Sequence, residues 1–336
     1  MSNTISRFKV LFLITCVLGF GLTLEQGASQ KTTKPELSGD IRAHDPSMIK
    51  AGNFYYVFAT GDENGLGEGS VQIRRSSDMQ NWEFVGTMFN ELPTWIAKEI
   101  AKVPNLWAPD VAFVNGKYLV YYAASHFGKN DSVIGLASNV TLDPNDPNYK
   151  WLDEGMVIRS HSSDRWNAID ANRVVDAKGQ PWLAFGSYWD GIKMRKLDAK
   201  TNKLSVQDTK LYALASRGGG AIEAASLIYQ KGYYYLFVSF DRCCQGANSN
   251  YKIKMGRSKN ITGPYARRDN WPMMAGDGDL VLEGHDNIRG PGGQTVFNDN
   301  GTIRMVYHYY DADAFGATKF QVETLTFGKD GWLELK

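Results

Sequence analysis

The chain has 336 residues, a formal net charge of +1 and 43% hydrophobic residues. Nine Trp, 17 Tyr and 16 Phe accompany 34 Gly, and this combination favours many short strands joined by tight turns over long helices. The balanced charge excludes the basic footprint of a nucleic-acid-binding protein and a basic patch for anionic lipid. Binding a neutral polymer such as a polysaccharide requires neither.

The first 29 residues have the pattern of a secretory signal peptide. Arg7 and Lys9 precede an apolar run at residues 10–24, and small residues follow, which is the order found in cleaved signals. The run is too short and too interrupted by Gly for a membrane span. A lipoprotein anchored through Cys16 is the alternative, but the residues before this cysteine fit that motif poorly. We therefore expect a secreted protein, extracellular or periplasmic.

The mature chain is expected to begin with a short polar leader at residues 30–40, followed by one repetitive domain at residues 41–336. Removing residues 1–29 takes away two of the 37 basic and one of the 36 acidic residues, leaving 35 of each. Five segments of the domain share one plan: an acidic or small residue, a short apolar strand, a polar turn and an aromatic strand. They begin at Asp45, Asp110, Asp170, Glu223 and near Gly293.

Each repeat predicts a β-hairpin, because its turn contains the Gly that tight hairpin turns require. The starts lie 65, 60, 53 and about 70 residues apart, which leaves room for two more strands per repeat. Additional strands are expected at residues 71–75 and 133–137, and Trp82 is expected to pack between blades. Radial repetition of four-stranded sheets predicts an all-β fold, a five-bladed β-propeller. The alternative, a β-sandwich or two stacked β domains, agrees less well with five similar units.

The first strand of each propeller blade lines the central axis, so residues at one repeat position should form a ring there. We expect this ring to contain Asp45, Asp110, Asp170 and Glu223, with Gly293 or Gln294 in the fifth place. Converging carboxyl groups repel one another and are partly desolvated, so their pKa values should separate. Such clusters are more often functional than structural.

Paired carboxyl groups in a neutral, aromatic-rich, secreted protein point to glycoside hydrolysis, which needs one protonated carboxyl and one ionised carboxylate. Trp107, Phe127, Tyr188 and Trp189 flank the axial strands, where aromatic faces can stack on sugar rings. For each of Asp45, Asp170 and Glu223 the non-catalytic interpretation is a turn-capping or structural carboxylate.

Seven motifs in one order resemble glycoside hydrolase family 43, in particular its arabinan endo-1,5-α-L-arabinanases, over residues 40–330. They are His44-Asp45-Pro46-Ser47-Met48, Leu106-Trp107-Ala108-Pro109-Asp110, Asn167-Ala168-Ile169-Asp170, Gly186-Ser187-Tyr188-Trp189-Asp190-Gly191, Glu223-Ala224-Ala225, Phe240-Asp241-Arg242-Cys243-Cys244-Gln245-Gly246 and Tyr307-His308-Tyr309-Tyr310-Asp311.

This resemblance implies a five-bladed propeller and an inverting mechanism. It assigns Asp45 as the general base that activates water and Glu223 as the general acid that protonates the leaving oxygen. Asp170 would orient the acid and raise its pKa by repulsion. Inversion predicts base and acid carboxyls roughly 6.5–9.5 Å apart, with room for water. Asp110 has no chemical role in the family and is interpreted as structural, holding backbone amides.

Further residues are expected to contact the sugar chain. Trp107, Phe127 and Trp189 are candidates for stacking, with blade packing as the alternative, and Asn167, Ile169 and Ser187 flank the site. The substrate implied is arabinan, as found in pectin side chains. We expect a monomer with no membrane or nucleic-acid partner.

No cofactor is required for this chemistry, although the resemblance implies an optional hydrated Ca²⁺ or Na⁺ on the axis. The family approaches that ion with the histidine of a Gly-Pro-Gly-His stretch, which here reads Gly290-Pro291-Gly292-Gly293-Gln294. Gln294, His285 and His308 are the remaining residues expected nearby. His308 could equally be a core histidine, so no metal ligand is assigned.

Cys243 and Cys244 are adjacent, so they cannot staple a loop and lack the spacing of a zinc site. They are interpreted as a vicinal disulfide, two free thiols lining a subsite, or a buried pair filling space. Two other functions stay open: an exo-acting α-L-arabinofuranosidase or β-xylosidase of the same family, and a non-catalytic carbohydrate-binding propeller.

Overall fold

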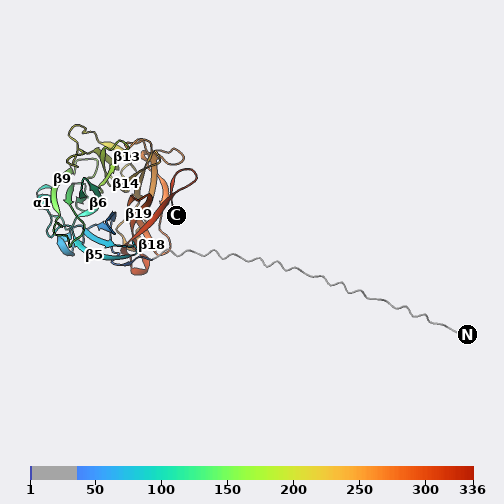
Figure 1. The fold of residues 1–336 in the computed structure, drawn as a ribbon. Coiled ribbons are helices and arrows are strands. Elements are labelled where there is room, and N and C mark those ends of the chain that lie inside the picture. Colours follow the sequence, from blue (N-terminus) through green and yellow to red (C-terminus); the bar gives the residue numbers. More distant parts are fainter. Residues whose placement is uncertain (2–35) are drawn as a thin grey trace. The chain divides into compact units, whose positions relative to one another are not determined.

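The computed structural model describes Met1 and residues 36–336, and the predicted signal peptide and most of the polar leader lie outside this range. Residues Glu36–Lys336 form one compact unit. Its strands make five separate sheets of four or five strands, arranged around a common centre (Figure 1). The predicted five-bladed β-propeller is therefore confirmed.

The blades follow one another along the chain, and each is built from a continuous segment. Blade 1 contains β2 (Ser47–Ala51), β3 (Phe54–Ala59), β4 (Gln72–Ser76) and β5 (Asn81–Thr87), with β1 (Ser38–Gly39) paired in parallel to β5. Blade 2 contains β6 (Trp107–Val114), β7 (Lys117–Ala124), β8 (Ser132–Asn139) and β9 (Leu152–Ser160). Blade 3 contains β10 (Asn172–Val175), β11 (Pro181–Phe185), β12 (Ile192–Lys196) and β13 (Tyr212–Ala215).

Blade 4 contains β14 (Ile222–Gln230), β15 (Tyr233–Phe240), β16 (Lys252–Ser258) and β17 (Asp279–Leu282). Blade 5 contains β18 (Ile288–Asp299), β19 (Thr302–Asp311), β20 (Ala317–Phe327) and β21 (Leu333–Leu335). Within each blade, consecutive strands pair antiparallel. Four short 3₁₀ turns, η1 (Leu66–Gly69), η2 (Gly246–Asn248), η3 (Met273–Ala275) and η4 (Ala312–Ala314), lie in the connections, and β5 and β6 are joined through α1 (Thr94–Ile100).

The hairpin turns have the backbone that their sequence predicts. Asn115-Gly116, Lys231-Gly232 and Asn300-Gly301 all have positive φ at both positions, as two-residue turns between twisted antiparallel strands require. Within residues 36–336, no helix is both long and apolar enough to cross a membrane.

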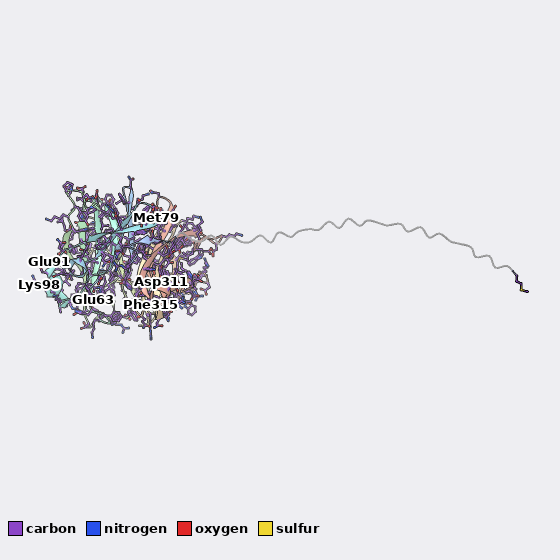
Figure 2. All side chains as sticks on the ribbon, turned by 90° about the horizontal axis from the view of Figure 1, so that it is seen from below. Glu63, Met79, Glu91, Lys98, Asp311 and Phe315 are labelled. Atoms are coloured by element: carbon purple, nitrogen blue, oxygen red, sulfur yellow. A yellow bond between two sulfur atoms is a disulfide. The ribbon has the colours of Figure 1, made fainter. Side chains whose placement is uncertain are left out.

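Apolar packing lies between neighbouring blades. The described residues form five buried hydrophobic clusters, each contributed by two adjacent blades, while charged side chains such as Glu91 and Lys98 lie exposed at the periphery (Figure 2). Trp82 is 2% exposed and packs edge-on against Phe320 of blade 5, which confirms its predicted place between blades. Blades 1 and 5 therefore close the ring by side-chain packing.

A ring of hydrogen bonds links the first strands, which contact one another around the axis. One side chain of each first strand forms a hydrogen bond with the backbone of the next blade. The pairs are Ser47 Oγ with Val111 N (3.1 Å), Asp110 Oδ2 with Arg173 N (2.7 Å), Asn172 Oδ1 with Leu227 N (2.9 Å), Ser226 Oγ with Val296 N (2.9 Å) and Thr295 Oγ1 with Pro46 O (2.9 Å). These bonds set how far each axial strand stands from its neighbour.

Candidate active site

The site lies where the first strands begin. At this point each blade has one residue with a left-handed backbone: Asp45 (φ 49°), Ala108 (43°), Asp170 (57°), Ala224 (53°) and Gly293 (56°). Each stands two residues before a member of the hydrogen-bond ring. Asp45 and Asp170 are therefore equivalent positions in two blades, and the same turn of the backbone directs both carboxyl groups.

The predicted ring of four equivalent acids is wrong in two places. Asp110 lies two residues beyond the left-handed position, and Glu223 lies one residue before it. The pairing of first and second strands is irregular at Trp107/Asp110, Glu223/Ser226 and Gly292/Thr295. Such bulges insert residues that an apolar pattern does not reveal.

Asp110 has the structural role expected for it. It is 5% exposed and accepts hydrogen bonds from Arg173 N and Asn172 Nδ2. Burial raises the pKa of its carboxyl to about 7, and the two donors oppose this shift only in part. Asp110 therefore holds blade 3 against blade 2.

One cleft of about 790 Å³ collects the predicted site residues. Asp45, Asp170 and Glu223 line it together with all six residues expected to bind substrate: Trp107, Phe127, Asn167, Ile169, Ser187 and Trp189. Each of the five blades or its connecting loops contributes to the cleft or to the side chains that support it. The sequence pattern alone could not show that the loops converge here.

Asp45 is surrounded by hydrogen-bond donors. His44 Nδ1 lies 2.8 Å and Thr60 Oγ1 2.8 Å from its Oδ2. Burial alone would raise the pKa of Asp45, but the charge of His44, the hydrogen bonds from His44 and Thr60 and the proximity of His308 lower it below the usual value. Burial likewise opposes protonation of His44, but the charge of Asp45 raises the pKa of His44. The contact therefore favours a protonated His44 beside an ionised Asp45.

Glu223 and Asp170 have the opposite character. Burial, and then the charge of Asp45, raises the pKa of Glu223, although Ser187 and Tyr251 donate to its two oxygens. Burial and repulsion from Glu223 and Asp45 raise the pKa of Asp170 well above its usual value. Asp170 Oδ2 accepts from Ala224 N at 3.0 Å, so it is tied to the residue after Glu223. The surroundings thus favour the ionised form of Asp45 and the protonated form of the buried pair Glu223 and Asp170.

The predicted substrate-contacting aromatic residues differ in exposure. Phe127 is 81% exposed, so its face is open to a ligand in the cleft. Trp107 is partly buried and its Nε1 donates to Asn105 Oδ1 at 2.7 Å, which fixes the plane of the indole. Trp189 is partly buried and has a left-handed backbone (φ 38°).

The polar candidates already have protein partners. Asn167 is 2% exposed; its Oδ1 accepts from Ser132 Oγ and its Nδ2 donates to Lys129 O. Ser187 Oγ donates to Glu223 Oε2 at 2.5 Å. Ile169 is 8% exposed at the cleft wall. Ser187 therefore positions the carboxyl group of Glu223, and Asn167 holds the loop that contains Phe127.

Several functional neighbours were not identified from the sequence. Thr60 immediately follows β3, and its hydroxyl also accepts from Ala108 N, linking Asp45 to blade 2. Tyr251 precedes β16 and reaches Glu223, and Tyr310 OH lies 2.9 Å from His44 Nε2. Tyr310 belongs to a recognised motif, whereas no local signal distinguishes Thr60 or Tyr251.

The axial residues offer few protein ligands for calcium or sodium, although the buried His308 Nε2 has no hydrogen-bond partner among the described residues. Among the described residues, His44, Asp45 and His308 form a group whose potential ligand atoms lie within 4.8 Å of one another. However, Asp45 is bonded to His44 and Thr60, and His308 Nδ1 accepts from Asp45 N at 3.0 Å. A Cβ on Gly293 would lie 2.6 Å from both Asp45 Oδ1 and His308 Nδ1.

Calcium prefers six to eight oxygen ligands, and this group offers two imidazoles and one engaged carboxylate. The other residues expected nearby do not complete it. Gln294 bonds to Ser239 Oγ and Ala224 O, and His285 is exposed and pairs with Asp286. The mechanism below therefore uses only protein side chains and water.

Comparison with known proteins agrees with this geometry. The family model for glycosyl hydrolases family 43 matches residues 33–333. The chain belongs to this family. It is 42% identical over 329 residues to the extracellular endo-α-(1→5)-L-arabinanase 1 of Bacillus subtilis, covering 96% of this chain and 97% of that one. It is 36% identical over 305 residues to the extracellular exo-α-(1→5)-L-arabinofuranosidase ArbA of Cellvibrio japonicus, covering 87% and 86%.

Solved structures of family 43 enzymes share the fold. The GH43 endo-arabinanase from Bacillus licheniformis superposes with a TM-score of 0.82 at 43% identity, covering 89% of this chain and 99% of that one. An exo-1,5-α-L-arabinanase from a bovine ruminal metagenomic library gives 0.83 at 40% identity, covering 90% and 100%. This family 43 member is therefore a glycoside hydrolase, and its similarity extends to both endo- and exo-acting enzymes.

Proposed function

We propose that the protein is a secreted endo-1,5-α-L-arabinanase that cleaves internal bonds of arabinan with inversion. The observation that carries this proposal is the division of proton affinity in one cleft: the pKa of Asp45 is lowered while the pKa values of Glu223 and Asp170 are raised. Inverting hydrolysis needs one ionised carboxylate and one protonated carboxyl.

In this mechanism a water molecule attacks the anomeric carbon as Asp45 removes its proton. Glu223 transfers its own proton to the glycosidic oxygen, so that the C–O bond breaks and the leaving chain departs as an alcohol. Tyr251 and Ser187 hold the two oxygens of Glu223. Asp170 is the positioning residue, because it accepts a hydrogen bond from the amide of Ala224, which follows Glu223. Charge repulsion between the two carboxyl groups opposes ionising both, which favours a protonated Glu223.

Arabinan as substrate is supported by the names of the relatives. It is also supported by the Cellvibrio cellulosa α-L-arabinanase, which is 34% identical, shares the fold and was solved in complex with arabinohexaose. Endo action is supported by the endo-arabinanase of Bacillus subtilis, because its 42% identity extends over 96% of this chain. The exo alternative is favoured by the ruminal enzyme at 40% identity. Export would use the signal peptide predicted at residues 1–29.

Glu223→Gln tests the chemistry. We expect this variant to lose at least about 10³-fold in kcat on linear arabinan, since the group that donates the proton is removed. Binding of arabino-oligosaccharides, measured by calorimetry, should remain within a few-fold. Retained cleavage would contradict the assignment, and wild-type protein that binds but never cleaves would identify a carbohydrate-binding propeller.

Two product measurements separate the finer alternatives. Early release of mixed oligosaccharides from linear arabinan indicates endo action, whereas arabinose or one fixed oligomer alone indicates exo action. Proton NMR of the first product should show the β-anomer; the α-anomer would rule out inversion.

A further inference from the structure

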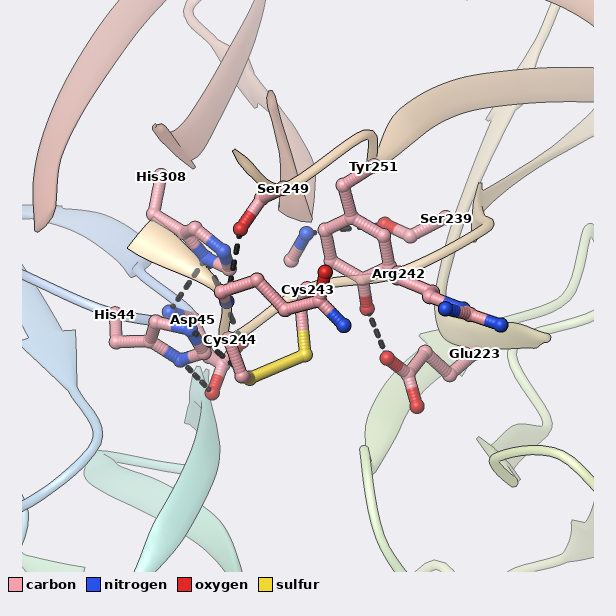
Figure 3. Close-up of a disulfide and its surroundings, with 12 residues drawn as sticks. His44, Asp45, Glu223, Ser239, Arg242, Cys243, Cys244, Ser249, Tyr251 and His308 are labelled. Carbon is pink, nitrogen blue, oxygen red and sulfur yellow. Dashed lines mark hydrogen bonds and ion pairs between the residues drawn. A yellow bond between two sulfur atoms is a disulfide. The ribbon is translucent and has the colours of Figure 1, made fainter. Parts of the chain in front are cut away.

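The structure joins Cys243 and Cys244 by a disulfide. Both residues line the cleft with Asp45 and Glu223, and Cys244 is exposed. The interpretation of a buried pair that fills space is therefore wrong. Figure 3 shows the disulfide between the group around His44 and Asp45 and the group around Tyr251 and Glu223.

We propose that the Cys243–Cys244 disulfide is a sugar-binding surface, an apolar platform for the arabinofuranose ring beside the base. This inference rests on the proposed arabinanase function and assigns a specificity-determining residue pair to it. A furanose ring presents C–H groups on its faces, and a bonded sulfur pair offers a polarisable apolar surface for them.

The disulfide lies close to the base. Cys244 Sγ is 3.9 Å from His44 Nε2, and His44 Nδ1 lies 2.8 Å from Asp45 Oδ2. The same cysteine's backbone N donates to Tyr310 OH at 2.7 Å, and Tyr310 OH also contacts His44. A ring resting on the two sulfurs would therefore sit beside the carboxylate that activates water.

The loop that carries the disulfide is fixed at both ends. Asp241 pairs with Arg217 at 2.8 Å and with Lys252 at 3.2 Å. Arg242 N donates to Asn250 Oδ1, and Arg242 O accepts from the backbone of Asn250 and Tyr251. A preformed surface binds without the entropy cost of ordering a flexible loop.

The loop also leads directly to Tyr251, the donor to Glu223. One short segment therefore places an apolar surface near the base and a hydroxyl on the acid. A disulfide between adjacent residues closes no loop and so adds little stability by constraining the unfolded chain. A role in the surface of the cleft explains its presence.

The test compares two double variants, Cys243→Ser/Cys244→Ser and Cys243→Ala/Cys244→Met. The first makes the surface polar and the second keeps it apolar. We expect the serine variant to raise KM for linear arabinan about five- to tenfold, on the scale of one lost apolar contact, with kcat changed less than about twofold. The methionine variant should lie closer to wild type, although both lose the disulfide.

Binding of arabinotriose by the same variants in the Glu223→Gln background should weaken in the same order. Equal KM values for wild type and the serine variant would overturn the proposal. Equal losses in both variants with a lowered Tm would also overturn it, because they indicate a purely structural bond.

If the serine variant does not fold, the folded wild type can be reduced with TCEP and its free thiols counted. Because free thiols keep the surface apolar, both are then alkylated with iodoacetate, which makes the surface charged. A KM unchanged after this alkylation would overturn the proposal, and a raised KM would support it. Wild-type protein that cleaves no arabinan would instead refute the underlying function, so the two failures are distinguishable.

Discussion

At the scale of single residues, the contact between His44 and Asp45 controls which carboxyl group stays ionised. Asp45 is buried, and burial by itself favours the neutral acid. The adjacent imidazolium reverses this preference. Glu223 has hydroxyl donors but no cation in hydrogen-bond contact, so burial decides its protonation. Two similar side chains thereby acquire different proton affinities.

His44→Gln should shift the pH dependence of activity. Asp45 must be ionised to act as a base, and the charge of His44 lowers its pKa. Removing that charge raises the pKa of Asp45, so the acid limb of kcat/KM against pH should move to higher pH. His285→Gln is the matched control, because it removes a histidine from a surface His–Asp pair. An acid limb that does not move would contradict this explanation.

Gly293→Ala should displace Asp45, the proposed base, although the two residues are far apart in the sequence. The position has φ 56°, and a Cβ there would lie 2.6 Å from Asp45 Oδ1 and His308 Nδ1. Displacing a reacting group by about 1 Å costs roughly 100-fold, so kcat should fall about 10- to 100-fold.

The control is Gly301→Ala, at φ 94° in a hairpin turn with no atom within 4 Å of its Cβ. It should cost about 1 kcal/mol of stability from backbone strain and leave kcat unchanged. Steady-state kinetics on both variants separate steric displacement from strain, and equal kcat values in the two would refute the steric account.

At the scale of elements, the first strands carry both the site and the bonds that space the blades. In blades 1 and 3 the left-handed residue is a carboxylic acid that lines the cleft, and two residues later a polar side chain reaches the next blade. Asp45, two residues before β2, and Ser47, the first residue of β2, show both features. A change in the ring therefore alters the distances between carboxyl groups in different blades.

Asn172→Ala should lower the free energy of unfolding more than the loss of a small polar side chain suggests. It removes the acceptor for Leu227 N and a donor to Asp110, and each buried group left unpaired costs about 1–3 kcal/mol. The exposed Asn148→Ala is the control, since its amide bonds only to nearby Asp146. Urea unfolding should show a loss of at least about 1 kcal/mol for the first variant and under about 0.5 kcal/mol for the second; similar values would deny the ring a stabilising role.

At the scale of the whole molecule, the ring closes between blade 1 and blade 5 without sharing a sheet. Phe320 packs on Trp82, Phe320 N donates to Ile41 O at 3.0 Å, and Tyr55 OH donates to Asp299 Oδ2 at 2.9 Å. Residues about 240 positions apart thus form the last interface. Closure depends on burial because the blades are separate sheets.

Phe320→Ala should open this interface. Phe320 is fully buried, and removing a buried phenyl ring costs about 3–5 kcal/mol. The matched control is Phe315→Ala, since Phe315 is exposed near the same strand (Figure 2) and should change the free energy of unfolding by less than about 0.5 kcal/mol. Urea denaturation measures both, and equal effects would show that the closure does not limit stability.

Sequence patterns were enough to predict the strands and their grouping into five blades, and family motifs predicted that Asp45, Asp170 and Glu223 share one cleft. These features are local: alternating apolar residues, Gly at turns and short motifs each depend on residues close in the chain. Asp110 was interpreted as structural because the family resemblance gives it no chemical role, and its hydrogen bonds to Arg173 and Asn172 agree with this. Its repeat position was misassigned, because a bulge leaves no mark in the apolar pattern.

Only the tertiary structure decided which groups meet at the axis. Thr60 on Asp45, Tyr251 on Glu223, and the disulfide beside His44 bring together segments from different blades or loops. Their approach depends on how adjacent blades pack and on the direction in which left-handed residues turn the chain. Neither quantity is encoded in a single segment, because each arises from the fit between sheets once the ring has closed.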